Sequence, residues 1–224
     1  MQDLDDAERE RWLGEAEFLK AYYHFCLLRM YGPIPVVTEN VPIDVSEEDV
    51  SVSRVPVDSC MNLIVRLLDS AAGKLPDIIS DPITEMGRIT RPIALAIKAR
   101  ALLYAASPLF NGNTDYSDFV DKEGEPFFNQ TEDQAKWQQA ADAALEAIQA
   151  AEAAGCTLYE FDNRTFRLSD TTIVQMSIRQ AVCERWNTEI VWGNPNSGTS
   201  EFGNSSSRSQ PDPANWFIDL GSEN

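Results

Sequence analysis

Four segments with helical apolar spacing, each ended by proline or glycine, constrain the fold of this chain more than any other feature. The first covers residues 14–31, ends at Gly32-Pro33, and places on one face Leu19, Tyr22, Tyr23, Cys26 and Met30. The other three cover residues 56–75, 90–106 and 131–155. The pattern predicts a mainly α-helical fold with long irregular loops and little β-structure.

Local signals indicate where these helices begin and end. Thr90 is the expected N-cap of the third helix, and Pro92 suits its first turn. Residues 131–134 (Thr-Glu-Asp-Gln) match a capping box that would open the fourth helix, and Gly155 would end it. The third segment is apolar around much of its circumference, which predicts burial on several sides and places Leu103 in the core.

Helical periodicity weakens after residue 155. Residues 156–159 look short and extended, and the β-rich composition of residues 187–192 predicts a strand. Residues 171–182 fit either a short helix or a strand. Ser, Asn, Gly and Pro dominate residues 193–211, which indicates a long irregular loop. We therefore divide the chain into a helical part, 1–155, and a loop-rich part of the same domain, 156–224, that looks truncated at its C-terminus.

Composition disfavours several classes of function. Eighteen lysines and arginines against 36 aspartates and glutamates give a net charge of −18, which repels phosphate backbones and anionic lipid headgroups. No apolar run reaches the length of a membrane span, and the acidic start of the chain is not a secretory signal. The four cysteines lie far apart and His24 is the one histidine, so a zinc cage is not expected. Uncharged partners such as sugars fit this surface better.

Small residues at helix contacts indicate helix pairs of the tetratricopeptide type. The spacing of Trp137, Ala140, Ala141 and Ala144 matches a first repeat helix, and the third segment, which closes with Tyr104 and Pro108, resembles a second repeat helix. A generic helical bundle is the alternative that this partial match leaves open.

Five motifs in order resemble the SusD/RagB family of nutrient-uptake lipoproteins. The first is the run 14–25 followed by Tyr31-Gly32-Pro33-Ile34-Pro35. The others are Arg54-Val55-Pro56 before a helix ending in Leu75-Pro76, the stretch from Gly87-Arg88 to Phe110-Asn111, Trp137-x-x-Ala140, and Trp186-Asn187-x-Glu189-Ile190. The resemblance covers roughly residues 12 to 193.

The resemblance implies a non-catalytic protein on the outer face of the outer membrane of Bacteroidota, anchored by a lipid. It implies binding of an oligosaccharide or other nutrient and partnership with a SusC-like TonB-dependent transporter. From the residues themselves we expect no cofactor, no metal and no nucleic-acid partner. A lipidation cysteine before residue 14 and the family's C-terminal half are not seen, so we expect an internal fragment.

Sugar binding needs flat aromatic faces for C–H groups, with amides and carboxylates for hydroxyls. The long polar loop 111–130 supplies Tyr116, Asn113 and Asp115, and the later segment supplies Trp192 and Phe202; we predict a glycan site among these five. Weaker candidates are Asn111, Phe127, Phe128, Trp186, Asn194, Asn196 and Trp216. Burial competes with ligand contact at Trp186 and Trp192, and the family resemblance assigns no sugar ligand to any of these positions.

Other functions fit the sequence less well. A helical-repeat scaffold for protein partners is the first alternative, since the helices alone would support it. A glycosidase is the second, but no spacing nominates a carboxylate pair among 36 acids. Residues 111–115 resemble the start of a calcium loop, yet its twelfth position would be Lys122 instead of glutamate.

Overall fold

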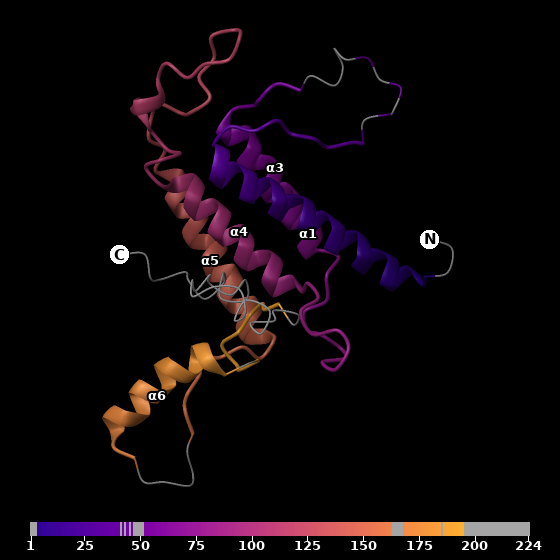
Figure 1. Ribbon diagram of the computed structural model, residues 1–224, viewed down its shortest axis with the longest axis vertical. Coiled ribbons are helices and arrows are strands. Elements are labelled where there is room, and N and C mark those ends of the chain that lie inside the picture. The colour runs from indigo at the N-terminus through magenta and orange to yellow at the C-terminus, as the bar shows by residue number, and fades with distance from the viewer. Residues whose placement is uncertain are drawn as a thin grey trace, which may run out of the picture. The chain divides into compact units, whose positions relative to one another are not determined.

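Helices dominate the computed structural model, which describes residues 4–40, 42, 44, 46, 52–162, 168–184 and 186–194. These residues form α1 (Asp6–Tyr31), α3 (Val57–Ala72), α4 (Arg91–Ala106), α5 (Ala135–Ala153), α6 (Asp170–Cys183) and a short 3-10 turn, η1 (Thr114–Tyr116) (Figure 1). This described part contains isolated β-bridges but no strand. The mainly α-helical prediction is confirmed.

The chain divides into two compact units. Unit 1 comprises residues 1–77 and 90–150, and unit 2 comprises residues 78–89 and 151–224. In unit 1, successive helices run in alternating directions (Figure 1). Gly14 near the start of α1 lies against the end of α3, where an added Cβ would meet the Ala71 carbonyl oxygen at 3.3 Å. Lys98 of α4 forms ion pairs with Asp69 of α3 at 2.7 Å and with Glu146 of α5 at 3.1 Å.

The predicted ends of α1, α3 and α4 follow from local chemistry. Gly32 ends α1 with φ of 69°, and its N–H donates to the Leu28 carbonyl. Pro56 occupies the N-cap position of α3 and Thr90 that of α4. The start of α1 differs from the prediction, because Asp5 caps the helix by accepting from the Glu8 N–H at 2.7 Å and so extends it eight residues before Gly14.

The predicted inward face of α1 is wrong. Tyr23 and Met30 are exposed at 61% and 65%, and the buried face consists of Gly14, Phe18, Ala21, Phe25 and Leu28. Both sets fit helical spacing, so periodicity alone could not separate them. Gly14 favours the observed inward face of α1, because its missing side chain lets the end of α3 approach α1 there. Leu103 is likewise not core: it is 52% exposed on α4.

The predicted capping box is also wrong, because α5 begins at Ala135, four residues after Thr131. Its first turn is capped instead by Asp133, whose carboxylate accepts from the Ala135 N–H at 2.9 Å. The other end of α5 matches the prediction. Gly155 has φ of 93°, and paired bonds from Gly155 N–H to Glu152 and from Cys156 N–H to Ala151 form a Schellman motif.

The structure of unit 2 contradicts the strand predicted for residues 187–192 and shows which of the two alternatives for residues 171–182 is right. Residues 171–182 lie within α6, whose N-cap Ser169 accepts from the Thr172 N–H. Residues 187–192 form turns instead of the predicted strand, since the Asn187 side-chain oxygen accepts from the Glu189 N–H and folds the backbone locally. None of the described helices is long and apolar enough to cross a bilayer.

Candidate functional site

The connection between α4 and α5, residues 107–134, brings three of the five nominated glycan residues together. Asn113, Asp115 and Tyr116 all belong to the short turn η1 or its cap. The Asn113 side-chain oxygen accepts from the Asp115 N–H at 2.9 Å, and its amide nitrogen donates to the Leu109 carbonyl at 3.0 Å. These two bonds hold the turn in place, so the three side chains lie within one small surface.

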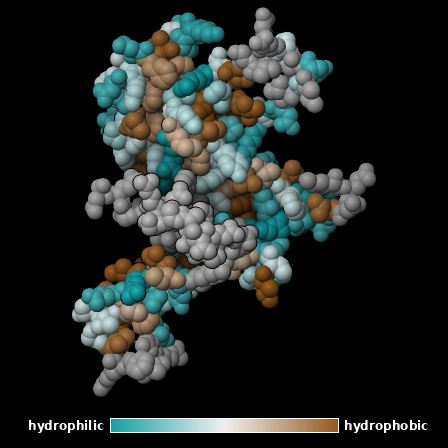
Figure 2. All heavy atoms as spheres, in the orientation of Figure 1, coloured by the Kyte–Doolittle hydropathy of each residue, from teal (hydrophilic) through white to brown (hydrophobic). Residues whose placement is uncertain are grey.

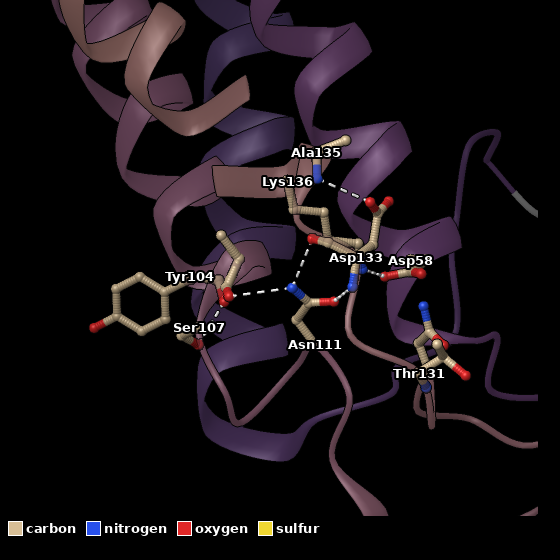
Figure 3. Close-up of polar contacts among 10 residues, drawn as sticks. Asp58, Tyr104, Ser107, Asn111, Thr131, Asp133, Ala135 and Lys136 are labelled. Carbon is tan, nitrogen blue, oxygen red and sulfur yellow. Dashed lines mark hydrogen bonds and ion pairs between the residues drawn. The ribbon is translucent and has the colours of Figure 1, made fainter. Parts of the chain in front are cut away.

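Asn111 ties the base of this connection together (Figure 3). Its side chain is 4% exposed; the amide nitrogen donates to the Asp133 carbonyl at 3.0 Å and to the Ala106 carbonyl at 3.4 Å. The amide oxygen accepts from the Asp133 N–H at 2.8 Å. One side chain therefore satisfies backbone groups at the end of α4 and before α5, which makes Asn111 a structural residue instead of a sugar ligand.

Further contacts attach the loop to the helices. Gly112 donates its N–H to the Asn129 carbonyl, and an added Cβ would lie 2.8 Å from the Glu132 backbone nitrogen. The Lys136 ammonium pairs with the Asp58 carboxylate of α3 at 2.6 Å. At the start of α3, the Val57 N–H donates a hydrogen bond to the Phe127 carbonyl. The loop is thus anchored at several points, so a ligand would meet a surface that is already formed.

A stack of three aromatic rings carries the exposed Tyr116 side chain. The Phe128 ring lies between that of Phe110, with centroids 6.1 Å apart, and that of Tyr116, 4.9 Å apart and inclined by 22°. Phe110 and Phe128 are buried, while Tyr116 is 44% exposed. The buried rings fix the plane of the outer one, and a ring held in this way offers a flat face to the C–H groups of a sugar.

Phe119 is a second exposed ring that the sequence reasoning missed. It packs on Phe127 with centroids 4.9 Å apart, and the Arg54 guanidinium lies 5.9 Å from its centroid. Arg54 also donates to the Pro33 carbonyl at 3.3 Å. The spacing of Tyr116 and Phe119 within a polar loop was the sequence signal that could have identified Phe119. Only the fold shows that Phe127 and Phe128 lie beneath these rings as support and are not themselves platforms.

The charge around the rings favours an uncharged ligand. Residues 111–130 contain five acids and one base, Lys122. Asp115 is exposed at the turn, and no described group donates a hydrogen bond to its carboxylate. That carboxylate can accept from sugar hydroxyls, while the surrounding acids repel anionic ligands. Among the residues that the structure describes, no cluster of histidine, cysteine or acids could hold a metal ion.

The remaining nominated residues lie elsewhere. Trp192 belongs to unit 2, where it is half-buried and its indole N–H donates to the Gly87 carbonyl at 3.2 Å. Trp186, also in unit 2, has φ of 59° and packs its ring against Gly193. Asn194 is exposed. Phe202, Asn196 and Trp216 fall outside the described residues. The assignment of sugar ligands to these positions stays a prediction.

Comparison with known proteins relates part of the chain to SusD-like proteins. A SusD-like family model, described as starch-binding and associating with the outer membrane, matches residues 2–103. The solved structure named BT4246 is 36% identical, with a TM-score of 0.74 over 85% of this chain. A SusD-like protein (BF3747) from Bacteroides fragilis NCTC 9343 is 19% identical and has a TM-score of 0.50. This match covers 70% of the present chain and 23% of the length of BF3747, and it supports the fold alone.

The match to BT4246 spans 36% of the length of that protein. Comparison with curated proteins finds no match. The family model and the BT4246 match nonetheless agree with the ordered motifs of the sequence and with the helical fold. The chain is thus similar to SusD-like proteins over residues 2–103, and the likeness to BT4246 extends over 85% of its length.

Proposed function

We propose that this chain is part of a non-catalytic glycan-binding subunit of an outer-membrane nutrient import complex, and that Tyr116 is the platform of a site for uncharged glycans. The family description supports binding of starch-like glucans at the outer membrane. The observation that carries the site is the stack of Tyr116 on Phe128, with the Asp115 carboxylate one residue away. A rigid ring beside an acceptor without a partner is what recognition of a pyranose requires.

The acidic loop refines the class of ligand. A uronic acid or a sulfated sugar would bring negative charge close to Asp115 and its acidic neighbours, and like charges at short range repel. A neutral α-glucan carries no such penalty. The site is therefore proposed for neutral oligosaccharides, with Tyr116 and Phe119 contacting sugar faces and Asp115 accepting from hydroxyl groups.

The test is calorimetric titration of the chain with α-1,4-glucan oligosaccharides. Replacing Tyr116 by alanine should weaken binding about two- to tenfold, since one aromatic contact contributes about 0.5–1.5 kcal/mol. Asp115→Asn keeps the size of the side chain and should change affinity less. Tyr23→Ala is the matched control, because Tyr23 is an exposed tyrosine on α1, away from the loop. Equal binding by Tyr116→Ala and the parent chain would refute this site.

Two further parts of the proposal need separate measurements. Incubating glucan with the chain should release no new reducing ends, as expected of a binding protein. Purification from membranes of the native host should recover a SusC-like TonB-dependent transporter, and surface labelling of intact cells should reach the protein. Release of reducing ends that is lost on mutating one Asp or Glu would support a glycosidase instead.

A further inference from the structure

Two arginines between α1 and α4 have no carboxylate partner among the described residues. Arg29 of α1 places its guanidinium carbon 5.0 Å from the Tyr104 ring centroid and 5.7 Å from that of Phe25. Arg100 of α4 has a buried Nε atom with no hydrogen-bond partner. By contrast, Lys98, two residues before Arg100, contacts two carboxylates. A chain with 36 acids leaves these two cations unpaired on the described surface.

Arg29 of α1 lies against α4 through its contact with the Tyr104 ring. The edge of the Phe25 ring of α1 meets the Tyr104 ring of α4 at a centroid distance of 5.5 Å, and Figure 1 shows the two helices alongside each other. Burial raises the pKa of Tyr22 to about 12, with Cys26 adding to the rise, whereas the charges of Arg100 and Arg29 act in the opposite direction.

We define the α1–α4 face by Tyr22, Cys26 and Arg29 of α1 and by Arg100, Leu103 and Tyr104 of α4. On each helix these residues follow the spacing of one face. Leu103 is 52% exposed, and Leu19 and Met30 at the border of the face are also exposed. Figure 2 shows apolar side chains, in brown, at several places on the visible surface. The face therefore combines two unpaired cations with aliphatic side chains.

We propose that the α1–α4 face binds an acidic segment of a partner polypeptide in which aliphatic residues flank Asp or Glu. A carboxylate can accept two parallel hydrogen bonds from the exposed Arg29 guanidinium, and the positive charge of the half-buried Arg100 adds to the attraction. Aliphatic side chains would cover Leu103 and Met30. Sugar is the poorer occupant, because the Tyr104 ring already contacts Arg29 and Phe25 and offers less free surface than Tyr116. This proposal does not rest on the proposed glycan site.

The experiment measures fluorescence anisotropy of a labelled peptide, acetyl-Leu-Glu-Asp-Leu-Glu-Leu-amide, titrated with the full chain. The matched probe replaces each acid by its amide. We expect saturable binding of the acidic peptide, at least about tenfold weaker binding of the amide form, and loss of affinity with added salt, as charged hydrogen bonds predict. Arg29→Gln and Arg100→Gln should each weaken binding severalfold, and Arg29→Lys should recover part of the loss because it restores charge but not the planar fork.

Arg66→Gln is the matched control, because Arg66 is an exposed arginine on α3 with no ion pair among the described residues. Circular dichroism of each variant checks that the helices remain folded, and Arg29, itself exposed, provides a variant less prone to misfold than Arg100. The proposal is overturned by equal binding of the two peptides, by no saturation at about 1 mM, or by an equal effect of Arg66→Gln. Displacement by oligogalacturonate at the same affinity would overturn the choice of a polypeptide.

Discussion

Removal of the Asn111 amide should loosen the loop that carries the candidate glycan site. In Asn111→Ala, three hydrogen bonds disappear, two of them with good geometry at 2.8 and 3.0 Å. The Asp133 backbone N–H and carbonyl lose their side-chain partner at a site where the asparagine was buried. Because each bond contributes about 1 kcal/mol net and an unsatisfied buried group costs about 1–3 kcal/mol, the loss should be about 2–4 kcal/mol.

Urea unfolding followed by circular dichroism measures this loss as a shift of the midpoint at constant slope. Asn113→Ala is the control, because Asn113 also bonds the backbone twice but lies at the surface turn. We expect the control to lose less than about 1 kcal/mol. If the two variants lose equal stability, the interpretation of Asn111 as the residue that joins α4 to α5 is refuted. Weaker glucan binding by Asn111→Ala would further link the loop to the proposed site.

Three other predictions follow from burial, backbone geometry and charge. Leu68→Ala, at a fully buried position of α3, should cost about 2–5 kcal/mol in a denaturant melt, whereas Leu103→Ala should cost less than about 1 kcal/mol. Gly112→Ala forces a Cβ to within 2.8 Å of backbone and should lower the melting temperature clearly more than Gly124→Ala, where φ is also positive but the space is open. Burial lowers the pKa of Lys98, but its two carboxylate partners raise that pKa by more, so the net shift is upward from 10.5. The stability that Lys98 contributes relative to Lys98→Met should therefore hold below pH 10.5 and vanish as pH rises through the raised pKa.

The sequence predicted those features whose cause lies within a few residues. The end of α1 at Gly32, the bounds of α4 and the C-terminal glycine of α5 depend on proline, glycine and cap chemistry that is readable locally. The turn with Asn113, Asp115 and Tyr116 has an equally local cause, since asparagine folds its own backbone through its side chain, but the sequence analysis assigned this stretch only to a long polar loop. The order of loose motifs along the chain was enough to indicate the family.

Prediction failed where two local solutions were nearly equal. Residues 187–192 have the composition of a strand, but no partner strand pairs with them among the described residues, and the Asn187 turn forms instead. The capping box at Thr131 satisfied every local rule, yet Asn111, twenty-two residues before Asp133, bonds the backbone there and α5 starts later. In both cases the winning hydrogen bonds depend on context that periodicity and composition do not contain.

Helical spacing by itself determined that this chain forms amphipathic helices that pack side by side, because burying apolar side chains at 3.6-residue intervals leaves few other folds. Which side of α1 turns inward was decided only by the tertiary structure, since Gly14 admits α3 along one stripe and leaves the neighbouring stripe outside. The same packing set Phe128 beneath Tyr116 and brought Arg29 close to Tyr104. Contacts between residues far apart in sequence require the assembled helices, so no local pattern could encode them.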